Sequence, residues 1–487
     1  MPLRWRLPDA FDPGTYLQDN PDVTGGRTAA ALHWLRHGRR EGRFPRRLEA
    51  LGVEQALWAG ESTAEASLRT LMAGKDRDEA LVARLALARV AAAGGDWEEA
   101  DRLLRGVDAR ADLIGRLGLP GPLLLQAEIA LHRGDAERAA RILRLVRRGF
   151  GQLPEERLMM ASLRADDGPG GPKAWRAALM PLYAPRNLDT PWPGPPAAAA
   201  IVPAGKTFDR LTAEAGPHVT DGPLVSVIMA ARGAAATIDT ALASLAAQSW
   251  HRLEVLVVDN GEGGGTTAPG MMTDRIEAWA ARDPRIRRIE GRAEPGAYAA
   301  RNLALSQAKG AMITLQDADD WSHPDRIARQ MADLKANPSR PACLSFWARV
   351  TNNLQATGLR PDVGLIHPNL SSLMIRREAA EQLGYWDRVR AGADSEYVDR
   401  LRRVFGAEAL GRVLPGLPLA FGRVEEDSLT RASATGLLGS GAAARAAYLA
   451  AARDWHARTP GPALPRHPAE RPFPVPPTLQ VPSGDTA

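Results

Sequence analysis

Three aspartates lie within four positions of the segment QDADDW, residues 316–321. A strand is expected just before them, over residues 311–315, so the chain enters this segment extended. Side chains two positions apart on an extended segment project to the same side, so Asp317 and Asp319 can both address one cation. Their mutual repulsion would be costly without one. Oxygen ligands of this kind select Mg²⁺ or Mn²⁺, which keep coordination positions open for phosphate oxygens.

The same aspartates also suit a surface turn, because Asp is common in turns and at helix starts. Asp320 could cap a helix that begins near Pro324. The position of the triplet decides between the two interpretations. It follows a strand in an alternating strand and helix pattern, where the ligand of an α/β sheet is expected, and we therefore favour a functional site.

The elements that must position these aspartates alternate along the chain. Apolar runs predict buried strands over residues 225–230 and 253–258, the second of which ends at Asp259. Helices are expected between and after them, over residues 238–248 and 299–308. This alternation predicts an α/β fold with a mostly parallel sheet flanked by helices, and ligands at the carboxyl ends of its strands.

Several motifs in this region resemble a known family when taken in order. The opening LVSVIMAARGAAATIDTALASLAAQSWHRLEVLVVDN, the later GAYAARNLALSQAKG before QDADDW, and the acidic GADSEYVDRL lie between residue 224 and about residue 430. Together they resemble a family-2 glycosyltransferase with the A-type nucleotide-sugar-binding fold. The DxD spacing alone would be weak support, since two aspartates one residue apart arise often by chance.

The resemblance implies roles for five residues on the donor side. Asp259 would accept hydrogen bonds from the nucleotide base, and Arg301 with Asn302 would shape the nucleotide pocket near the phosphates. Asp317 would contact the ribose side and share the metal, and Asp319 would hold that metal on the diphosphate. The expected cofactor is Mn²⁺ or Mg²⁺, acting as a Lewis acid that neutralises charge on the departing nucleoside diphosphate.

The resemblance also implies a general base on the acceptor side. The family places an acidic residue at a helix start after the donor region, and Asp394 occupies that place, with Glu396 as the fallback. Such a carboxylate would activate a sugar hydroxyl for in-line displacement, giving inversion at the anomeric centre. The simpler interpretation, in which Asp394 caps the following helix, is compatible with this role.

The chain departs from the family pattern at the base pocket. It has Ala230 and Arg232 where many relatives have Pro and Tyr, and Asn260 with the glycine run 261–265 where Asp-Gly-Ser is commoner. The glycine run fails the dinucleotide-binding pattern at its last glycine, so a flexible loop is expected there.

Three further features are expected to have mainly structural roles. His323 follows the acidic turn and suits a positional role as well as a phosphate contact. Trp386 and Asp387 resemble the family's aromatic-Asp pair near the acceptor, although a core tryptophan is the commoner outcome. His456 receives no role.

The rest of the chain divides at its prolines. Residues 184–223 carry eight prolines and predict an extended linker, and residues 459–487 carry nine and predict a disordered tail. Between these seams, residues 224–458 form the expected catalytic domain. Before the linker, residues 1–48 resemble a small helical module found beside bacterial polysaccharide-assembly glycosyltransferases.

Residues 49–183 predict helical hairpins. The segments 81–105 and 123–147 each pair two amphipathic helices across a Gly-Asp turn, in which Asp96 and Asp135 can cap the second helix. They resemble tetratricopeptide-type repeats, which bind protein segments. A helical spacer that only packs on its neighbour is about as probable.

Composition limits the remaining possibilities. A single cysteine, Cys343, excludes an intramolecular disulfide or a multi-cysteine zinc site. The first ten residues lack an apolar signal sequence and no run reaches the length of a membrane span, so we expect a cytoplasmic protein, peripheral at most to the inner membrane face. The formal net charge of +5 suits anionic sugar nucleotides better than nucleic acid.

The sequence thus predicts a metal-dependent, inverting glycosyltransferase that moves a sugar from a nucleoside-diphosphate sugar to a glycan or lipid-linked glycan acceptor in bacterial surface polysaccharide synthesis. Two other classes stay open. A scaffold protein with a degenerate transferase domain would use the helical hairpins to recruit partners. A glycoside hydrolase would also need two carboxylates, but neither metal nor nucleotide.

Overall fold

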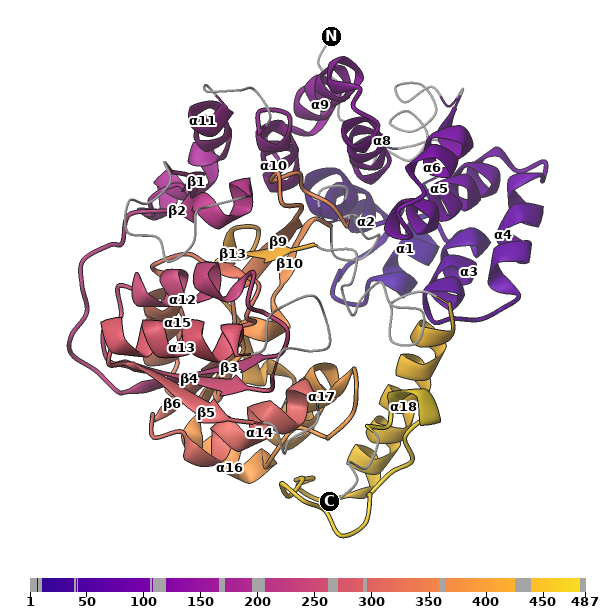
Figure 1. Cartoon of the computed structure of the whole chain (residues 1–487). Helices are drawn as coiled ribbons and strands as arrows, with labels where there is room; N and C mark the ends of the chain where they lie inside the picture. Colours follow the sequence, from indigo (N-terminus) through magenta and orange to yellow (C-terminus); the bar gives the residue numbers. More distant parts are fainter. Residues whose placement is uncertain are drawn as a thin grey trace. The chain divides into compact units, whose positions relative to one another are not determined.

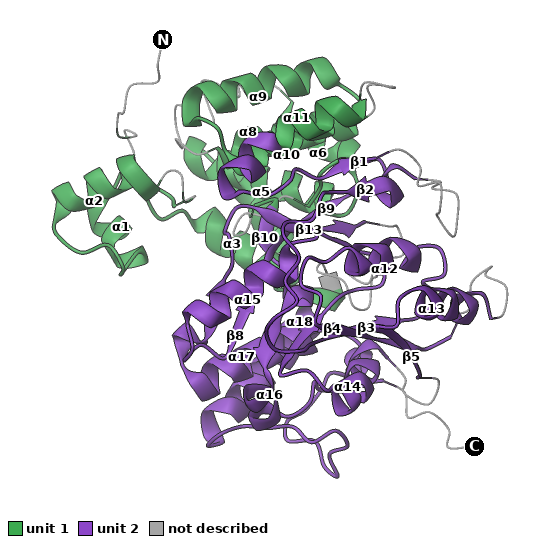
Figure 2. Ribbon diagram, turned by 90° about the vertical axis from the view of Figure 1, so that its left-hand side faces the viewer, with its two compact units in different colours: residues 1–179, 354–365, 437–442 green, residues 180–353, 366–436, 443–487 purple. Residues whose placement is uncertain are grey.

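The computed structural model describes residues 7, 11–38, 41, 43–105, 107, 120–165, 171–194, 206–261, 270–291, 296–358, 364–424 and 439–481 (Figure 1). The chain forms two compact units (Figure 2). Unit 1 comprises residues 1–179, 354–365 and 437–442, and unit 2 comprises residues 180–353, 366–436 and 443–487.

Unit 1 is mainly helical in its described part. Its α-helices are α1 (Pro13–Asp19), α2 (Arg27–His33), α3 (Glu49–Trp58), α4 (Ala64–Met72), α5 (Arg77–Ala93), α6 (Trp97–Leu104), α8 (Gly121–His132), α9 (Ala136–Phe150), α10 (Pro154–Ser162) and the start of α11 (Gly171–Tyr183). The first two, with the π-helical turn η1 (Trp34–Gly38), enclose a small core of their own around Tyr16 and Trp34. No further function follows from this packing.

The two Gly-Asp turns cap helices as the sequence predicts. Asp96 accepts a hydrogen bond from the Glu99 amide at 2.9 Å at the start of α6, and Asp135 accepts one from the Arg138 amide at 2.9 Å at the start of α9. The two helical hairpins, α5 with α6 and α8 with α9, are therefore present. Their likeness to tetratricopeptide repeats stays a prediction.

Unit 2 is built on a seven-stranded sheet with the strand order β12-β8-β11-β6-β3-β4-β5. The strands are β3 (Val225–Ala231), β4 (Leu253–Asp259), β5 (Ile286–Glu290), β6 (Met312–Leu315), β8 (Ala342–Leu344), β11 (Met374–Arg376) and β12 (Leu410–Arg412). All pairings are parallel except those of β11, which runs antiparallel to β6 and β8. The predicted α/β class with a mostly parallel sheet is confirmed.

Helices cover both faces of this sheet. The helices α12 (Ile238–Ala246), α13 (Met271–Arg282) and α15 (Arg326–Ala336) lie on one face, and α14 (Ala297–Gln307), α16 (Arg377–Leu383) and α17 (Ala393–Phe405) lie on the other (Figure 1). Alternate strand residues such as Ile228, Leu256 and Leu315 join the core under the second group of helices, as the period of two requires. The helix α18 (Gly439–Arg458) adds Tyr448 and Trp455 to that core.

A second, four-stranded sheet has the order β10-β9-β13-β7. Its strands are β7 (Trp321–Ser322), β9 (Phe346–Val350), β10 (Ile366–Pro368) and β13 (Pro418–Arg423). Because β7 begins at Trp321, directly after the acidic segment, that segment joins the end of β6 in the large sheet to the start of β7 in the small one.

The first proline-rich segment differs from an extended linker wherever the structure describes it. Its described parts contain the short strands β1 (Trp192–Pro193) and β2 (Leu211–Thr212), which pair with each other, and the 3-10 turns η4 (Ala184–Arg186) and η5 (Thr207–Arg210). Phe208 is fully buried, and its amide donates to the carbonyl of Asn352 at 3.0 Å. Apolar side chains between the prolines fix this segment on unit 2.

The second proline-rich segment is also ordered over residues 459–481, where we expected disorder. Four of its apolar side chains enter the core of unit 2: Leu464, Phe473, Val475 and Leu479. Its backbone bonds compensate for the missing proline donors, because the Tyr385 amide donates to the Leu464 carbonyl at 2.8 Å and the Arg390 amide to the Leu479 carbonyl at 2.8 Å. Proline density alone therefore misjudges this segment.

Candidate active site at the carboxyl edge of the large sheet

The two predicted donor-side carboxylates flank the central strand β3. Ala231 at the end of β3 is in register with Asp259 at the end of β4, and Ile228 on the same strand is in register with Leu315 at the end of β6. Asp317 is the second residue after the end of β6. Because β3, β4 and β6 are parallel, Asp259 and Asp317 lie at the same edge of the sheet.

Asp259 is buried and is held by three protein donors. Its Oδ2 accepts hydrogen bonds from Thr273 Oγ1 at 2.6 Å and from Arg288 Nε at 2.8 Å, and its Oδ1 accepts one from the Gly261 amide at 3.1 Å. Burial acts to raise the pKa of Asp259, but these hydrogen bonds outweigh it and hold the pKa below its usual range. The carboxylate is thus ionised and keeps limited acceptor capacity for a nucleotide base.

Asp317 meets Arg301 across the edge. Arg301 is buried on α14, and its Nη2 donates to Asp317 Oδ1 at 2.8 Å. The hydroxyl of Ser371, in the 3-10 turn η6 (Leu370–Ser372), donates to Asp317 Oδ2. Both oxygens of Asp317 therefore have protein partners, which fix the orientation of this carboxylate.

Asp319 is a carboxylate of this segment whose negative charge is disfavoured by its surroundings. Burial and the negative charge of Asp317 raise the pKa of Asp319 to about 6, although Arg349 and Arg423 on the small sheet oppose that rise. No described side chain donates a hydrogen bond to the Asp319 carboxylate. Its lone pairs are therefore available to an external ligand.

The sequence suggested that Asp320 caps the following helix, but in the structure it does not. It is buried, its Oδ1 accepts a hydrogen bond from the Arg423 amide at 3.2 Å, and α15 begins only after Asp325. Burial, followed by the charges of Asp319 and Asp317, raises the pKa of Asp320 well above its ordinary value. The residue anchors the acidic segment to β13.

A divalent cation fits this donor set. Within the described residues, no three His, Cys, Asp or Glu side chains come together as a metal site, so the protein can offer one or two carboxylates. Mg²⁺ and Mn²⁺ at sites of nucleotide chemistry are often held in this way, with substrate phosphates completing the coordination. The raised pKa of Asp319 also indicates a repulsion that a cation would relieve.

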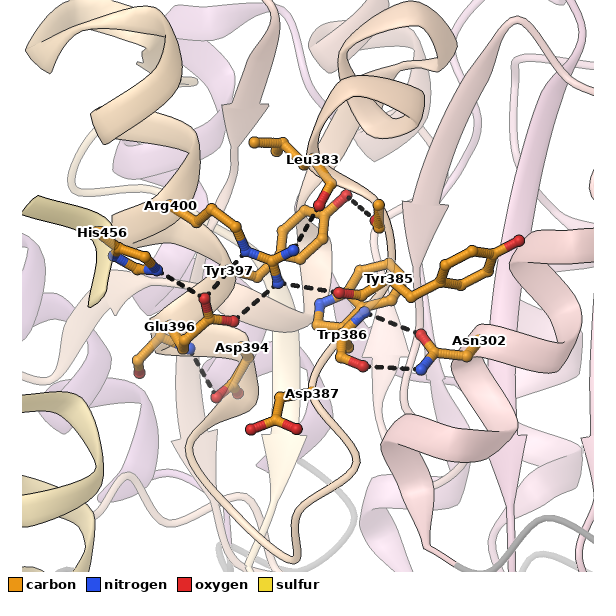
Figure 3. Close-up of polar contacts among 12 residues, drawn as sticks. Asn302, Leu383, Tyr385, Trp386, Asp387, Asp394, Glu396, Tyr397, Arg400 and His456 are labelled. Atoms are coloured by element: carbon orange, nitrogen blue, oxygen red, sulfur yellow. Dashed lines mark hydrogen bonds and ion pairs between the residues drawn. The ribbon is translucent and has the colours of Figure 1, made fainter. Parts of the chain in front are cut away.

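Asn302 has a different place from the one expected beside the phosphates. Its Nδ2 donates to the carbonyl of Trp386 at 2.8 Å, and its Oδ1 accepts from the Trp386 amide at 2.9 Å (Figure 3). Both ends of the amide are therefore used to hold a backbone segment 84 residues away. Asn302 is buried, and its side-chain amide is directed at the Trp386 backbone.

Trp386 and Asp387 likewise serve the core. The Trp386 ring is buried and stacks on Tyr397 with ring centroids 4.6 Å apart. Asp387 is buried and pairs with Arg471 in the second proline-rich segment, with Nη2 to Oδ2 at 2.6 Å. A role for these two residues at an acceptor is not supported by these contacts.

Asp394 lies in the first turn of α17, after Gly392 with φ at +96°. It is partly exposed, and its Oδ1 accepts a hydrogen bond from the Ser395 amide at 2.9 Å. Its charge reaches the donor side: burial opposes the charge on Arg301, but the carboxylate of Asp317 and more weakly that of Asp394 raise the pKa of Arg301. Arg301 thus hydrogen-bonds to Asp317 and is influenced electrostatically by Asp394.

Glu396, the fallback base, is inaccessible. It is 0% exposed and accepts hydrogen bonds from Arg400 Nε at 3.0 Å, Arg400 Nη2 at 2.8 Å and His456 Nε2 at 2.8 Å (Figure 3). Burial alone would raise the pKa of Glu396, but Arg400 and His456 together lower it. A carboxylate enclosed in this way cannot take a proton from an acceptor.

Three contacting residues were not foreseen: Ser371, Arg288 and Arg423. None belongs to a motif, and each contacts an aspartate from a strand or turn distant in the sequence. Arg349 acts on Asp319 through its charge. His323, by contrast, is positional: its Nε2 lies 2.9 Å from the Asp189 carbonyl, and its Nδ1 accepts from the Asp325 amide at 3.0 Å. Of the glycine run 261–265, all but Gly261 lies outside the described residues.

The part of the chain that contains the donor-side residues is similar to a known protein family. Residues 226–384 match the family model for glycosyl transferase family 2. The match includes Asp259, Arg301, Asp317 and Asp319 and ends before Asp394. This stretch of the chain is thus similar to family 2 glycosyltransferases.

Two curated relatives are similar to part of this chain. The succinoglycan biosynthesis protein ExoO of Rhizobium meliloti is 34% identical over 115 residues, which are 24% of this chain and 31% of that protein. The UDP-Glc:alpha-D-GlcNAc-diphosphoundecaprenol beta-1,3-glucosyltransferase WfgD of Escherichia coli is 30% identical over 117 residues, which are 24% of this chain and 43% of that protein. The chain thus spans less than half the length of either relative.

Among solved structures, the mannosyltransferase PcManGT from Pyrobaculum calidifontis, in complex with GDP-Man and Mn²⁺, is 23% identical. The overlap covers 44% of this chain and 61% of that one, with a TM-score of 0.32. No helix among the described residues has both the length and the apolar character that crossing a membrane requires.

Proposed function

We propose that this protein is a metal-dependent, inverting glycosyltransferase that moves a sugar from a nucleoside-diphosphate sugar to a glycan acceptor. The observation that carries the proposal is the Asp317 carboxylate at the carboxyl edge of the parallel sheet, where Arg301 Nη2 donates to it at 2.8 Å. Asp394, in the first turn of α17, supplies a second, partly exposed carboxylate. A partly exposed carboxylate suits a general base that takes a proton from an acceptor hydroxyl.

On the donor side, Asp319 would hold Mn²⁺ or Mg²⁺, with Asp317 beside it. The cation would neutralise charge on the departing nucleoside diphosphate. Asp317, oriented by Arg301 and Ser371, would also face the ribose, and Asp259 would receive the base with its remaining lone pairs. We assign Asn302 to support of this pocket.

On the acceptor side, Asp394 would take the proton from the attacking hydroxyl. A hydroxyl that attacks the anomeric carbon opposite the departing diphosphate displaces it in line, which inverts the configuration at that carbon. Asp394 suits this role because it is partly exposed and its Oδ2 has no described hydrogen-bond partner.

The names of two relatives support the acceptor class that we propose. ExoO is named for succinoglycan biosynthesis and WfgD for a diphosphoundecaprenol-linked acceptor. We propose a lipid-linked glycan of bacterial surface polysaccharide synthesis, reached from the cytoplasm at the inner face of the membrane. The helical hairpins of unit 1 would then recruit protein partners.

The test is turnover of defined donors by the full chain. UDP-glucose, UDP-N-acetylglucosamine and GDP-mannose are each incubated with Mn²⁺ and with a diphospholipid-linked N-acetylglucosamine, and released nucleoside diphosphate is measured. We expect release from at least one donor, lost on adding EDTA and restored by Mn²⁺. No release from any donor, with no heat of binding for UDP or GDP, would contradict the proposal.

A scaffold with a degenerate domain is not favoured, because the carboxylates at Asp317, Asp319 and Asp394 are intact and ordered. A glycoside hydrolase is not favoured either, because the sequence relatives are glycosyltransferases. Binding of nucleoside diphosphate that strengthens with Mn²⁺ separates the transferase from both.

A further inference from the structure

A buried charged cluster begins two residues after the proposed base, in the same turn of α17. Its three members, Glu396, Arg400 and His456, are 0%, 0% and 3% exposed. Glu396 Oε1 receives both Arg400 Nε at 3.0 Å and His456 Nε2 at 2.8 Å (Figure 3). Glu396 and Arg400 lie on α17, whereas His456 comes from α18, so the cluster joins two helices through one carboxylate.

The cluster also fixes the segment that precedes α17. Arg400 Nη2 donates to the Tyr385 carbonyl at 2.9 Å, and Arg400 Nη1 donates to the Leu383 carbonyl. The next residue, Trp386, is held through its backbone by Asn302, the neighbour of Arg301 on α14. Hydrogen bonds, together with the peptide bond between Tyr385 and Trp386, thus connect His456 with α14, the helix that carries Arg301.

A second contact ties α18 to the start of α17. Gly392 immediately precedes α17, and a methyl group placed on it would lie 3.2 Å from Tyr448 Cδ1 of α18. The Tyr448 hydroxyl donates to Asp387 at 3.1 Å. Farther along, Arg453 Nε pairs with Asp399 at 2.7 Å. The helix α18 therefore contacts α17 at its start, its first turn and its second turn.

We propose that His456 is a positioning residue that holds the first turn of α17, and with it Asp394, in place for proton transfer. The inference rests on the proposed function, since it gives a task to Asp394. Asp394 lies two residues before Glu396 in the same turn, so anchoring Glu396 from α18 limits how that turn can move. Glu396 is accordingly a positioning residue and not a second base.

Stability alone does not account for the cluster. Replacing a buried ion pair by apolar residues of similar volume is often neutral or stabilising, so a packed apolar contact between the two helices would serve a purely structural purpose equally well. A hydrogen-bonded charge network fixes the relative orientation of the two helices as well as their distance. The orientation matters here because proton transfer depends on the placement of the Asp394 carboxylate.

The test compares two amide substitutions that differ by one methylene. In His456→Gln the side-chain Nε2 can reach Glu396, whereas in His456→Asn the amide is too short. Arg458→Gln, which removes an exposed ion pair with Asp454 on the same helix, is the matched control. The rate of UDP release from UDP-glucose, or of GDP release from GDP-mannose, is measured with Mn²⁺ at saturating donor.

We expect kcat of His456→Asn to fall about tenfold to a hundredfold, with the donor KM within about threefold of the parent, because misplacing a catalytic group by about 1 Å costs this much. His456→Gln should stay within about threefold of the parent, and Arg458→Gln should match it. In an Asp394→Asn background, His456→Asn should cause no further loss, since a positioning residue has nothing left to position.

Three kinetic results would overturn the inference. They are equal rates for His456→Asn and His456→Gln, a loss in His456→Asn that appears only as a raised donor KM, or a full additional loss in the Asp394→Asn background. Hydrogen exchange at the amides of residues 393–397 gives a readout that does not depend on turnover. Exchange should rise in His456→Asn and not in His456→Gln, and equal exchange in the two would also overturn it. A parent protein without turnover would instead count against the proposed function.

Discussion

Asp319 is the proposed metal ligand, and its negative charge is unfavourable in the absence of a cation. Burial and the nearby carboxylate of Asp317 raise its pKa to about 6, so at neutral pH the folded state holds an unfavourable negative charge. We predict that Asp319→Asn stabilises the metal-free protein by about 1 to 2 kcal/mol at pH 7.5. Urea unfolding in EDTA measures this gain.

The same substitution should remove the response to metal. With UDP and Mn²⁺ present, the parent should gain stability through ligand linkage, and Asp319→Asn should gain little. Asp333→Asn, which affects a carboxylate paired with Arg340 away from the site, serves as the control and should respond like the parent. An Mn²⁺ response in Asp319→Asn equal to that of the parent would exclude Asp319 as the metal ligand.

Asp394 is expected to act in transfer and not in donor binding. Removing a general base costs about a hundredfold to ten-thousandfold in rate, so Asp394→Asn should lose transfer by that factor. Calorimetric affinity for UDP or GDP with Mn²⁺ should stay within about threefold of the parent. Full transfer by Asp394→Asn would show that another group takes the proton.

The sequence was a good guide to residues at strand ends and a poor guide to their partners. Spacing after a predicted strand was enough to select Asp317 and Asp319, because a strand end at the edge of a parallel sheet is a local property. The contact from Ser371 to Asp317 joins residues 54 apart and depends on tertiary packing. For the same reason Glu396 could not be distinguished from an accessible base until His456 was placed beside it.

At the level of elements, the period of apolar residues predicted the sheet and its helices, whereas proline content misled. Prolines remove amide donors but leave carbonyls and side chains free to contribute. The second proline-rich segment uses both: the Leu464 carbonyl receives an amide, and Phe473 enters the core. A composition rule for disorder cannot detect such spaced apolar anchors.

We predict that ending the chain after Arg458 destabilises unit 2. The truncation exposes the core around four buried apolar side chains of this segment, each worth about 1.5 to 3 kcal/mol, and leaves buried Asp387 without Arg471. A loss of roughly 5 kcal/mol or more is expected in urea unfolding. Glu470→Gln, at an exposed position, should change nothing, and an unchanged midpoint after truncation would show that the segment adds no stability.

The buried cluster on α17 should make the free energy of unfolding depend on pH. The pKa of Glu396 is held below 4.5 in the folded state by Arg400 and His456. A lowered carboxyl pKa contributes stability that is present above pH 4.5 and is lost as the pH falls through the folded value. Glu396→Gln should therefore be about 3 to 5 kcal/mol less stable at pH 7, and the difference should narrow at pH 4. A constant difference would contradict the assigned ion pairing.

At the scale of the whole chain, the division into units is not linear. The sequence predicted a domain boundary in the proline-rich segment at residues 184–223. The boundary between the compact units falls instead between Leu179 and Met180, and residues 354–365 also belong to unit 1. This segment lies between β9 and β10. In it the Ala356 amide donates to Ser162 at 2.9 Å, and the Gly358 amide donates to Glu128 at 2.8 Å. No motif or composition signal marks such an exchange.

This exchange has a consequence for any attempt to isolate the catalytic region. A protein that begins at Met180 keeps residues 354–365 but lacks the helices of unit 1, so Leu354, Ala356 and Leu365, now 0%, 0% and 1% exposed, would face water. We predict that this fragment aggregates, and that replacing residues 354–365 with a Gly-Ser linker of equal length gives a monomer that still binds UDP or GDP with Mn²⁺, because no proposed site residue lies in the segment. Light scattering and calorimetry on the two fragments test this. If the unmodified fragment is as monomeric as the linker variant, residues 354–365 do not depend on unit 1.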